Sequence, residues 1–295
     1  MKRNCQSTLD CYVISPREKS NNPSKRLKGE SSIFVSCPLC DRSVLPDFIN
    51  DHIDNNCGNR TKAIKLNEEH IQSQNPFHIF MDCPLTKLYF SFDIIPSKEL
   101  PGLYSISEFM TELEEAELIS ALDNDLNNPW STSHFNGIQL TKKWGVITDY
   151  NTRKVRQNNI DNNEFPFPSY LSFLLHRIEI LKQNGFELLK SINFIPNEGN
   201  SMCYIRSAKH YLKAHFDDRY LSGPILINIS LQCDSYMTFR REKPIHNAHT
   251  VKVLMKRRSM HIVSKQSRYE YTHSIDNSDI YGDRRLSIVF RQAGS

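Results

Sequence analysis

His215 and Asp217 are separated by a single residue within the stretch from Tyr211 to Arg219. Side chains two positions apart on a β-strand point to the same face, so this imidazole and this carboxylate can converge on one point. Two histidines and one carboxylate on one face of a metal leave coordination positions open, as in non-haem Fe(II) oxygenases. A His-x-Asp pair also arises by chance on protein surfaces, so this interpretation needs a third ligand and a cosubstrate site elsewhere in the chain.

Two stretches nearer the C-terminus supply these parts. His273 follows the aromatic run Arg268-Tyr-Glu-Tyr271 and is a candidate third ligand. Arg285, Ser287 and Arg291 lie at even spacings on one predicted strand, so they share a face while the apolar residues between them pack behind. Two guanidinium groups on a buried face need a carboxylate partner, and the planar Arg side chain is suited to pair with one. A dicarboxylate such as 2-oxoglutarate meets that need.

The order of these motifs resembles the AlkB family of Fe(II)/2-oxoglutarate dioxygenases over roughly residues 100 to 295. The motifs are His-x-Asp, then Arg-Tyr-x-Tyr-Thr-His-x-Ile, then Arg-x-Ser-x-x-Phe-Arg-Gln-Ala. The resemblance implies that His215, Asp217 and His273 bind iron and form the catalytic centre. It also implies an enzyme that uses Fe(II) and 2-oxoglutarate to oxidise an N-methyl group, which then leaves as formaldehyde.

The same resemblance assigns the cosubstrate site. Arg285 would pair with the distal carboxylate of 2-oxoglutarate, and Arg291 would lie at its other end and brace Asp217. Tyr204 occupies the position of the tyrosine in the family's Asn-x-Tyr element and would hydrogen-bond the cosubstrate. Met202 stands where that element has asparagine, so one cosubstrate contact differs. This departure is the observation that keeps a degenerate, non-catalytic adaptor open as an alternative.

A region rich in basic and aromatic residues precedes a helix expected at 169–184, and in the family this region forms a substrate lid. Basic side chains bind phosphates and aromatic rings stack on bases, so alkylated DNA, or RNA, is the expected substrate. A solvated charged hairpin is the alternative, and a core position suits Trp144 equally well. Asp218 and Arg219 follow the ligands directly, where they would contact a flipped base or form a structural salt bridge. The predicted substrate-binding residues are Lys142, Trp144, Tyr150, Arg153, Asp218 and Arg219.

The run from Ala214 to Gly223 is similar to one mammalian subgroup of the family. This similarity keeps a methylated protein side chain open as a second possible substrate. The two enzyme hypotheses share their chemistry and differ only in the molecule that enters the pocket.

A second metal site is predicted near the N-terminus, where the spacing Cys-x2-Cys is followed by His-x4-Cys after an eleven-residue insert. Its four ligands are Cys37, Cys40, His52 and Cys57. Four N and S ligands suit tetrahedral Zn²⁺, and a fragment this small needs the metal to fold. The stretch resembles UBZ-type ubiquitin-binding zinc fingers, which implies a contact between Asp54 and ubiquitin, although the family's commoner spacing is His-x3-Cys. A purely structural finger is the alternative, and the acidic helix disfavours one that reads DNA.

The first 32 residues are polar and charged, with few large apolar groups, so we expect them to be disordered. Gln6, Leu9 and Tyr12 have the spacing of peptides that bind the sliding clamp PCNA, with Val13 in place of the final aromatic. A chance pattern is equally consistent with these residues. The basic run 25–28 is consistent with a nuclear import signal or with an ordinary solvated segment. Together with the finger, these features predict a nuclear DNA-repair demethylase recruited to ubiquitinated sites, with cytoplasmic residence also open.

Composition limits the remaining choices. The formal charge of +4 over 295 residues permits nucleic-acid contact without requiring it. No run has the length of a transmembrane helix, so no membrane partner is expected, and the eight cysteines suit thiols and metal ligands. Many short strands with turn signals predict a mainly β (α+β) fold, a double-stranded β-helix or jelly roll with flanking helices, plus a small ββα zinc finger. The expected organisation is a tail at 1–32, the finger at 33–60, a linker at 61–98 and the dioxygenase domain at 99–295.

Overall fold

The computed structural model describes residues 35–39, 43–44, 49–54, 77–82, 89–149, 154–156, 166–184, 186–243 and 248–294. The predicted tail with its PCNA-like residues Gln6, Leu9 and Tyr12 lies outside this set. Several predicted site residues also lie outside it, namely Cys40, Cys57, Tyr150 and Arg153. None of the helices within the described ranges is both long enough and apolar enough to cross a membrane.

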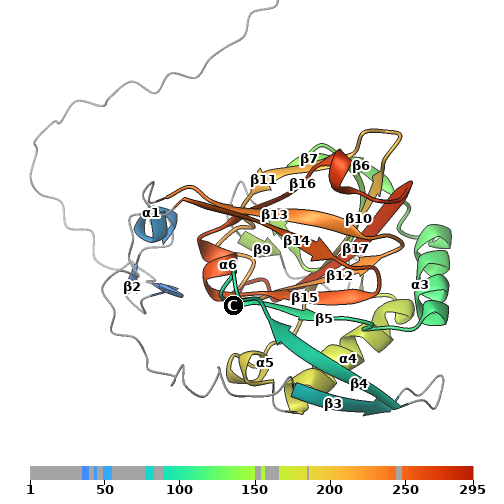
Figure 1. The fold of residues 1–295 in the computed structure, drawn as a ribbon, viewed down its shortest axis with the longest axis horizontal. Helices are drawn as coiled ribbons and strands as arrows, with labels where there is room; N and C mark the ends of the chain where they lie inside the picture. Colours follow the sequence, from blue (N-terminus) through green and yellow to red (C-terminus); the bar gives the residue numbers. More distant parts are fainter. Residues whose placement is uncertain are drawn as a thin grey trace, which may run out of the picture. The chain divides into compact units, whose positions relative to one another are not determined.

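The chain forms a curled antiparallel sheet whose strands make two layers (Figure 1). The first layer contains, in spatial order, β7 (Gly137–Gly145), β10 (Glu198–Ile205), β17 (Arg284–Arg291), β12 (Leu226–Leu231), β15 (Ser259–Val263), β5 (Leu103–Ile106), β4 (Tyr89–Pro96) and β3 (Phe77–Asp82), with β6 (Ser131–Ser133) beside β7. The second layer contains β11 (Tyr211–His215), β16 (Thr272–Ile275), β13 (Ser235–Arg241) and β14 (His249–Met255). The fold is therefore mainly β and consistent with the predicted jelly roll.

Strand β7 joins the two layers. Its C-terminal part pairs with β10 from Leu140 to Gly145, and its first residues pair with Tyr211 and Leu212 of β11. Apolar side chains from both layers, including Tyr204, Phe239 and others, form the core between them. The interior of this sandwich is where the predicted metal ligands and arginines meet.

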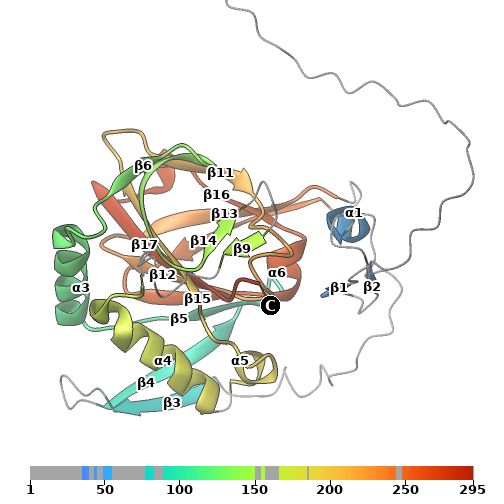
Figure 2. The same cartoon turned by 180° about the vertical axis from the view of Figure 1, so that it is seen from behind.

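Helices cover the outer side of the first layer (Figure 2). They are α3 (Glu112–Asn124), η4 (Ser169–Leu171), α4 (Ser172–Gln183) and α5 (Glu187–Ser191). Helix α3 begins where Thr111 caps it, with Glu114 closing a reciprocal capping box, as its acidic first turn predicts. Leu174, Ile178 and Leu181 of α4 recur at helical spacing and are almost fully buried against the sheet.

The alternation predicted for β17 is confirmed. Leu286, Ile288 and Phe290 pack in the core beneath the helices, whereas Arg285 and Arg291 face the space between the layers. Apolar burial on one face fixes the register, because a slip of one residue would turn both guanidinium groups towards the helices.

The N-terminal segment has two short strands and a helix in the expected order. Strands β1 (Val35–Ser36) and β2 (Ser43–Val44) pair, and α1 (Ile49–Asp54) follows. Cys37, Ile49 and Ile53 are buried together with Tyr269 of α6 (Lys265–Tyr269).

The short ribbon of β8 (Ile147–Asp149) with β9 (Lys154–Arg156) and the turn η6 (Asn277–Asp279) complete the elements of the described ranges.

Candidate active site

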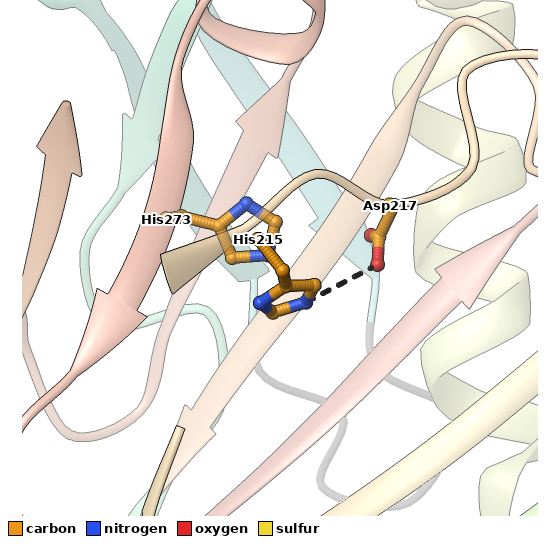
Figure 3. Close-up of side chains that lie close together, drawn as sticks. All are labelled: His215, Asp217 and His273. Atoms are coloured by element: carbon orange, nitrogen blue, oxygen red, sulfur yellow. Dashed lines mark ion pairs between the residues drawn. The ribbon is translucent and has the colours of Figure 1, made fainter. Parts of the chain in front are cut away.

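His215, Asp217 and His273 come together inside the sandwich (Figure 3). Their potential ligand atoms all lie within 4.8 Å of one another. Nε2 of His215 is 3.7 Å from Oδ1 of Asp217, and both side chains are largely buried. Among the residues that the structure describes, these three form the one His, Cys, Asp or Glu group placed to share a metal ion. The third ligand predicted from the sequence thus lies beside the first two.

The two histidines are positioned by strand pairing. His215 ends β11 and is the register partner of His273 on β16, and the two ring centroids are 4.4 Å apart. The sequence predicted that alternation along one strand brings Asp217 to His215. Asp217 lies beyond the end of β11, so alternation is not the cause of their proximity. Instead, Arg268 donates hydrogen bonds of 3.0 and 2.6 Å to the carbonyl oxygens of Asp217 and Asp218. This guanidinium holds the loop that carries the carboxylate ligand.

The tautomer of His215 follows from its hydrogen bond. Nδ1 lies 2.8 Å from the carbonyl oxygen of Lys213, which can only accept, so Nδ1 carries the proton. The lone pair of Nε2 is then available on the side of Asp217. Metal-binding histidines are commonly fixed in this way by a backbone carbonyl.

The protonation states of the other two residues also suit metal binding. Burial alone would raise the pKa of Asp217, but the charge of Arg291 opposes it, and the pKa is held well below its usual range. Nη2 of Arg291 lies 3.2 Å from Oδ2 of Asp217, so the predicted brace is present. Burial, with a smaller effect from His215, lowers the pKa of His273 to about 3. An ionised carboxylate and a neutral imidazole are the states in which Asp217 and His273 could ligate a metal.

A cavity between the layers is lined by these ligands together with Tyr204, Arg285 and Ser287. Arg285 is fully buried and donates to Ser235 Oγ at 2.7 Å and to Ser230 Oγ at 3.3 Å. Its Nη1 and the hydroxyl of Ser287 have no hydrogen-bond partner within the described part of the chain. A buried guanidinium with a spare donor next to a spare hydroxyl fits a carboxylate group, as 2-oxoglutarate would provide. We call this space the inner cavity.

Tyr204 also lines the inner cavity and is completely buried. The guanidinium carbon of Arg285 lies 5.4 Å from the centroid of its ring. Its hydroxyl contacts the sulfur of Met202 at 3.4 Å, and burial raises its pKa to about 12. The phenol is therefore a neutral donor at the predicted cosubstrate position.

A second cavity of about 340 Å³ adjoins the metal ligands, and we call it the outer cavity. It shares Met202, Leu212, His215, Asp217 and Arg291 with the inner cavity. His215 and Asp217 therefore line both a site suited to a dicarboxylate and a site large enough for a substrate group, whereas His273 lines the inner cavity.

Two predicted substrate residues on β7 point towards the helices. Lys142 is buried, with Nζ 5.1 Å from the centre of the Trp130 ring, and it does not line the outer cavity. Burial lowers its pKa. Trp144 is packed in the core, edge-on to Tyr170 at 6.4 Å, and also contributes to the cavity wall. The core position weighed for Trp144 is thus the observed one.

Asp218 and Arg219 are engaged in structural contacts. Oδ1 of Asp218 accepts backbone hydrogen bonds from Tyr220 at 2.9 Å and Leu221 at 2.7 Å, which closes a turn. Arg219 is buried and forms a salt bridge of 2.8 Å with Asp54. This pairing brings a predicted substrate residue and the predicted ubiquitin-binding residue into contact with each other.

Other residues at the outer cavity were not predicted. Lys143 and Phe135 are exposed at its rim, with Phe135 61% accessible, and Glu198 and Asn200 lie deeper. Lys143 lies next to the predicted Lys142. Neighbouring side chains of a strand point to opposite faces, so the register of β7 decides which of the two faces the cavity. Glu198 lies a few residues before the sequence motif that contains Tyr204, and it belongs to no motif itself.

Comparisons with known proteins find similar sequences and a similar fold, although no family model matches the chain. The chain is 25% identical over 246 residues to a DNA N6-methyl adenine demethylase of Caenorhabditis elegans, which covers 83% of this chain and 75% of the relative. It is 22% identical over 219 residues to the human alpha-ketoglutarate-dependent dioxygenase alkB homolog 4, which covers 65% of this chain and 67% of the relative. The solved structure of OsALKBH1 superposes with a TM-score of 0.50 at 14% identity, covering 68% of this chain and 99% of that one. The chain is homologous to AlkB-type 2-oxoglutarate/Fe(II) oxygenases, and the solved structure shows the same fold.

Proposed function

We propose that this protein is an Fe(II)- and 2-oxoglutarate-dependent oxidative demethylase of alkylated nucleic acid. The observation that carries the proposal is that His215 and Asp217 line both cavities, with His273 beside them in the wall of the inner cavity. One cavity offers buried donors to a carboxylate, and the other has room for a substrate group. This division matches a dioxygenase that must hold a cosubstrate and a methylated substrate on two sides of one metal.

The residues present fit the two groups. His215, Asp217 and His273 would hold Fe(II), while Arg285 and Ser287 would bind a carboxylate of 2-oxoglutarate. When bound, iron and 2-oxoglutarate supply oxidising power that removes an N-methyl group as formaldehyde while one O₂ is consumed and the cosubstrate becomes succinate and CO₂. The chain itself fixes the ligands, excludes water from the interior and orients the methyl group.

The rim of the outer cavity supports nucleic acid as the substrate class. Phe135 presents an exposed ring and Lys143 an exposed ammonium group beside the opening. A stacking ring next to a phosphate-binding cation is the pairing that extended nucleic-acid strands use. The similar protein from Caenorhabditis elegans is named for a methylated base in DNA, which supports DNA as the first polymer to test.

The test is a demethylation assay on defined polymers. The full chain, with Fe(II), ascorbate and 2-oxoglutarate, is incubated with methylated DNA, methylated RNA and methylated peptides, and formaldehyde and succinate are quantified. With methylated DNA we expect formaldehyde in the same amount as the succinate formed above the level without substrate, and the unmethylated oligonucleotide should give no formaldehyde. Turnover of peptides alone would replace the nucleic-acid proposal with the protein-substrate alternative. No formaldehyde from any substrate, with 2-oxoglutarate bound, would favour the adaptor hypothesis.

We also propose that the N-terminal segment is a zinc finger. The support is the strand–strand–helix order, the buried Cys37 and the position of His52 on α1. Elemental analysis of the purified chain should find zinc, and Cys37→Ser should lose it. Binding of ubiquitin and PCNA and a nuclear location stay predictions. A ubiquitin contact through Asp54 would require release of its salt bridge with Arg219.

A further inference from the structure

Glu198 is a buried carboxylate in the wall of the outer cavity, 5% exposed. Its Oε1 accepts a hydrogen bond of 3.2 Å from Nδ2 of Asn200 and lies 3.6 Å from Nη1 of Arg291. Its other oxygen, Oε2, is buried and has no hydrogen-bond partner among the residues that the structure describes. Oε1 is thus bound by protein groups, whereas Oε2 can still accept a hydrogen bond from a ligand.

Asn200 adds a second acceptor beside it. Because a carboxylate oxygen can only accept, the bond to Glu198 fixes the Asn200 amide with its nitrogen on that side. The amide oxygen Oδ1 of Asn200 therefore points away from this bond. It is also buried and has no hydrogen-bond partner in the described ranges. Glu198 and Asn200 share the face of β10 that carries Met202 and Tyr204, so both acceptors belong to the wall next to the metal site.

Buried acceptors without donors are unfavourable, and such groups are uncommon in folded proteins. A ligand that donates N–H groups would relieve both at once. A phosphate would not, because it brings negative charge and no donor at neutral pH. The chemistry of the wall therefore favours the nitrogen edge of a base over the polymer backbone.

We propose that Glu198, assisted by Asn200, selects substrates whose methylated nitrogen still carries a hydrogen. This inference rests on the proposed demethylase function and narrows its substrate class to N-monomethylamino groups, such as that of 6-methylaminopurine. Arg291 contacts both Glu198 and Asp217, so the carboxylate of Glu198 lies close to the candidate metal site. A dimethylamino group has no N–H and would leave Oε2 buried and unpaired.

The test compares two substrates that differ by one methyl group. Oligonucleotides of the same sequence carry either 6-methylaminopurine or 6-dimethylaminopurine, and formaldehyde release gives kcat/KM for each. The variants are Glu198→Gln, which presents an amide N–H₂ where Oε2 was, and Glu117→Gln, which makes the same charge change on the exposed side of α3. Succinate formed without substrate reports whether the iron and cosubstrate sites remain intact.

We expect the wild type to prefer the monomethyl substrate by roughly ten- to a hundredfold, the effect of one hydrogen bond to a charged group. Glu198→Gln should lose most of that preference, which is a ratio of two substrates on one protein and is therefore independent of an overall loss of activity, and Glu117→Gln should behave as wild type. An unchanged preference in Glu198→Gln, with the wild type active, would overturn this inference and leave the demethylase proposal standing. A wild type that forms succinate but removes no methyl group from either substrate, or from other methylated bases, would overturn both.

Discussion

Arg219 donates a hydrogen bond of 2.8 Å to Asp54, a residue 165 positions earlier in the chain. The guanidinium carbon of Arg219 also lies 3.8 Å from the centre of the Phe216 ring. Phe216 is the residue between His215 and Asp217 in the sequence. Helix α1 of the N-terminal segment therefore touches the loop that carries Asp217. Cys37, Ile49 and Ile53 pack with Tyr269 near this contact, so apolar burial accompanies the ion pair.

A double-mutant cycle tests this contact. Arg219→Gln and Asp54→Asn should each lower the free energy of unfolding, and the pair should show a coupling of about 1 kcal/mol because Asp54 is partly exposed. Urea unfolding of the four proteins measures the coupling. The exposed pair Arg240 and Glu242 is the matched control and should couple far less. Strictly additive effects at Arg219 and Asp54 would show that they are not partners in solution.

Arg285→Lys should weaken cosubstrate binding. Lys keeps the charge but lacks the planar fork that bonds Ser235 and Ser230 while leaving Nη1 for a carboxylate. We expect the KM for 2-oxoglutarate to rise by roughly tenfold or more. The neighbouring Arg284→Lys is the control, because Arg284 points to the opposite face and pairs with Asp123. Equal increases in both variants would argue against a cosubstrate role for Arg285.

Lys143→Glu and Phe135→Ala should weaken oligonucleotide binding and spare 2-oxoglutarate binding. Removing one phosphate contact reduces the slope of log affinity against log salt by roughly one, and lost stacking costs about 1–3 kcal/mol. Fluorescence anisotropy at several salt concentrations measures the first effect, and the KM for the oligonucleotide measures the second. Lys190→Glu on α5 is the control for net charge. If Lys190→Glu weakens binding as much as Lys143→Glu does, the rim of the outer cavity is not the polymer site.

His261 should make the fold sensitive to acid. It is buried on β15, and burial, followed by the charge of Arg285, lowers its pKa from 6.5 to about 4. The folded state thus resists protonating His261, while the unfolded chain takes up this proton near pH 6.5. The contribution of neutral His261 to the free energy of unfolding is complete above pH 6.5. It is lost as the pH falls towards 4, and the loss amounts to roughly 3 kcal/mol.

Urea unfolding of the wild type and His261→Gln between pH 7.5 and 4 measures this effect. The variant starts with lower stability at pH 7.5, and the difference between the two proteins should shrink as the pH falls. Two stability curves that stay parallel over this range would contradict the assignment to His261.

The alternation of β17 made its part of the site predictable from sequence. Arg285 and Arg291 interrupt an apolar strand at even spacing, and only one face can accept them without burying charge beneath the helices. On β7 the two basic residues Lys142 and Lys143 lie on opposite faces, so the charge pattern did not show which of them faces the cavity. Lys142 and Trp144 therefore point to the core, whereas Lys143 lines the cavity.

Contacts that depend on tertiary structure left no local signal. The salt bridge of Arg219 with Asp54 and the clamp of Arg268 on the Asp217 loop both join distant parts of the chain. Glu198 was unpredictable for another reason, because its importance lies in an oxygen without a partner, which only coordinates reveal.

The proposed function depends most on Fe(II) held by His215, Asp217 and His273 next to a site for 2-oxoglutarate. Anaerobic titration of the metal-free full chain with Fe(II), followed by 2-oxoglutarate, measures this directly through the visible charge-transfer absorption of chelated 2-oxoglutarate. We predict that the band appears only after 2-oxoglutarate is added, saturates at one Fe(II) per catalytic site, and disappears in His273→Ala. A band of wild-type intensity in the folded His273→Ala protein, or no band in the wild type, would rule out this iron site.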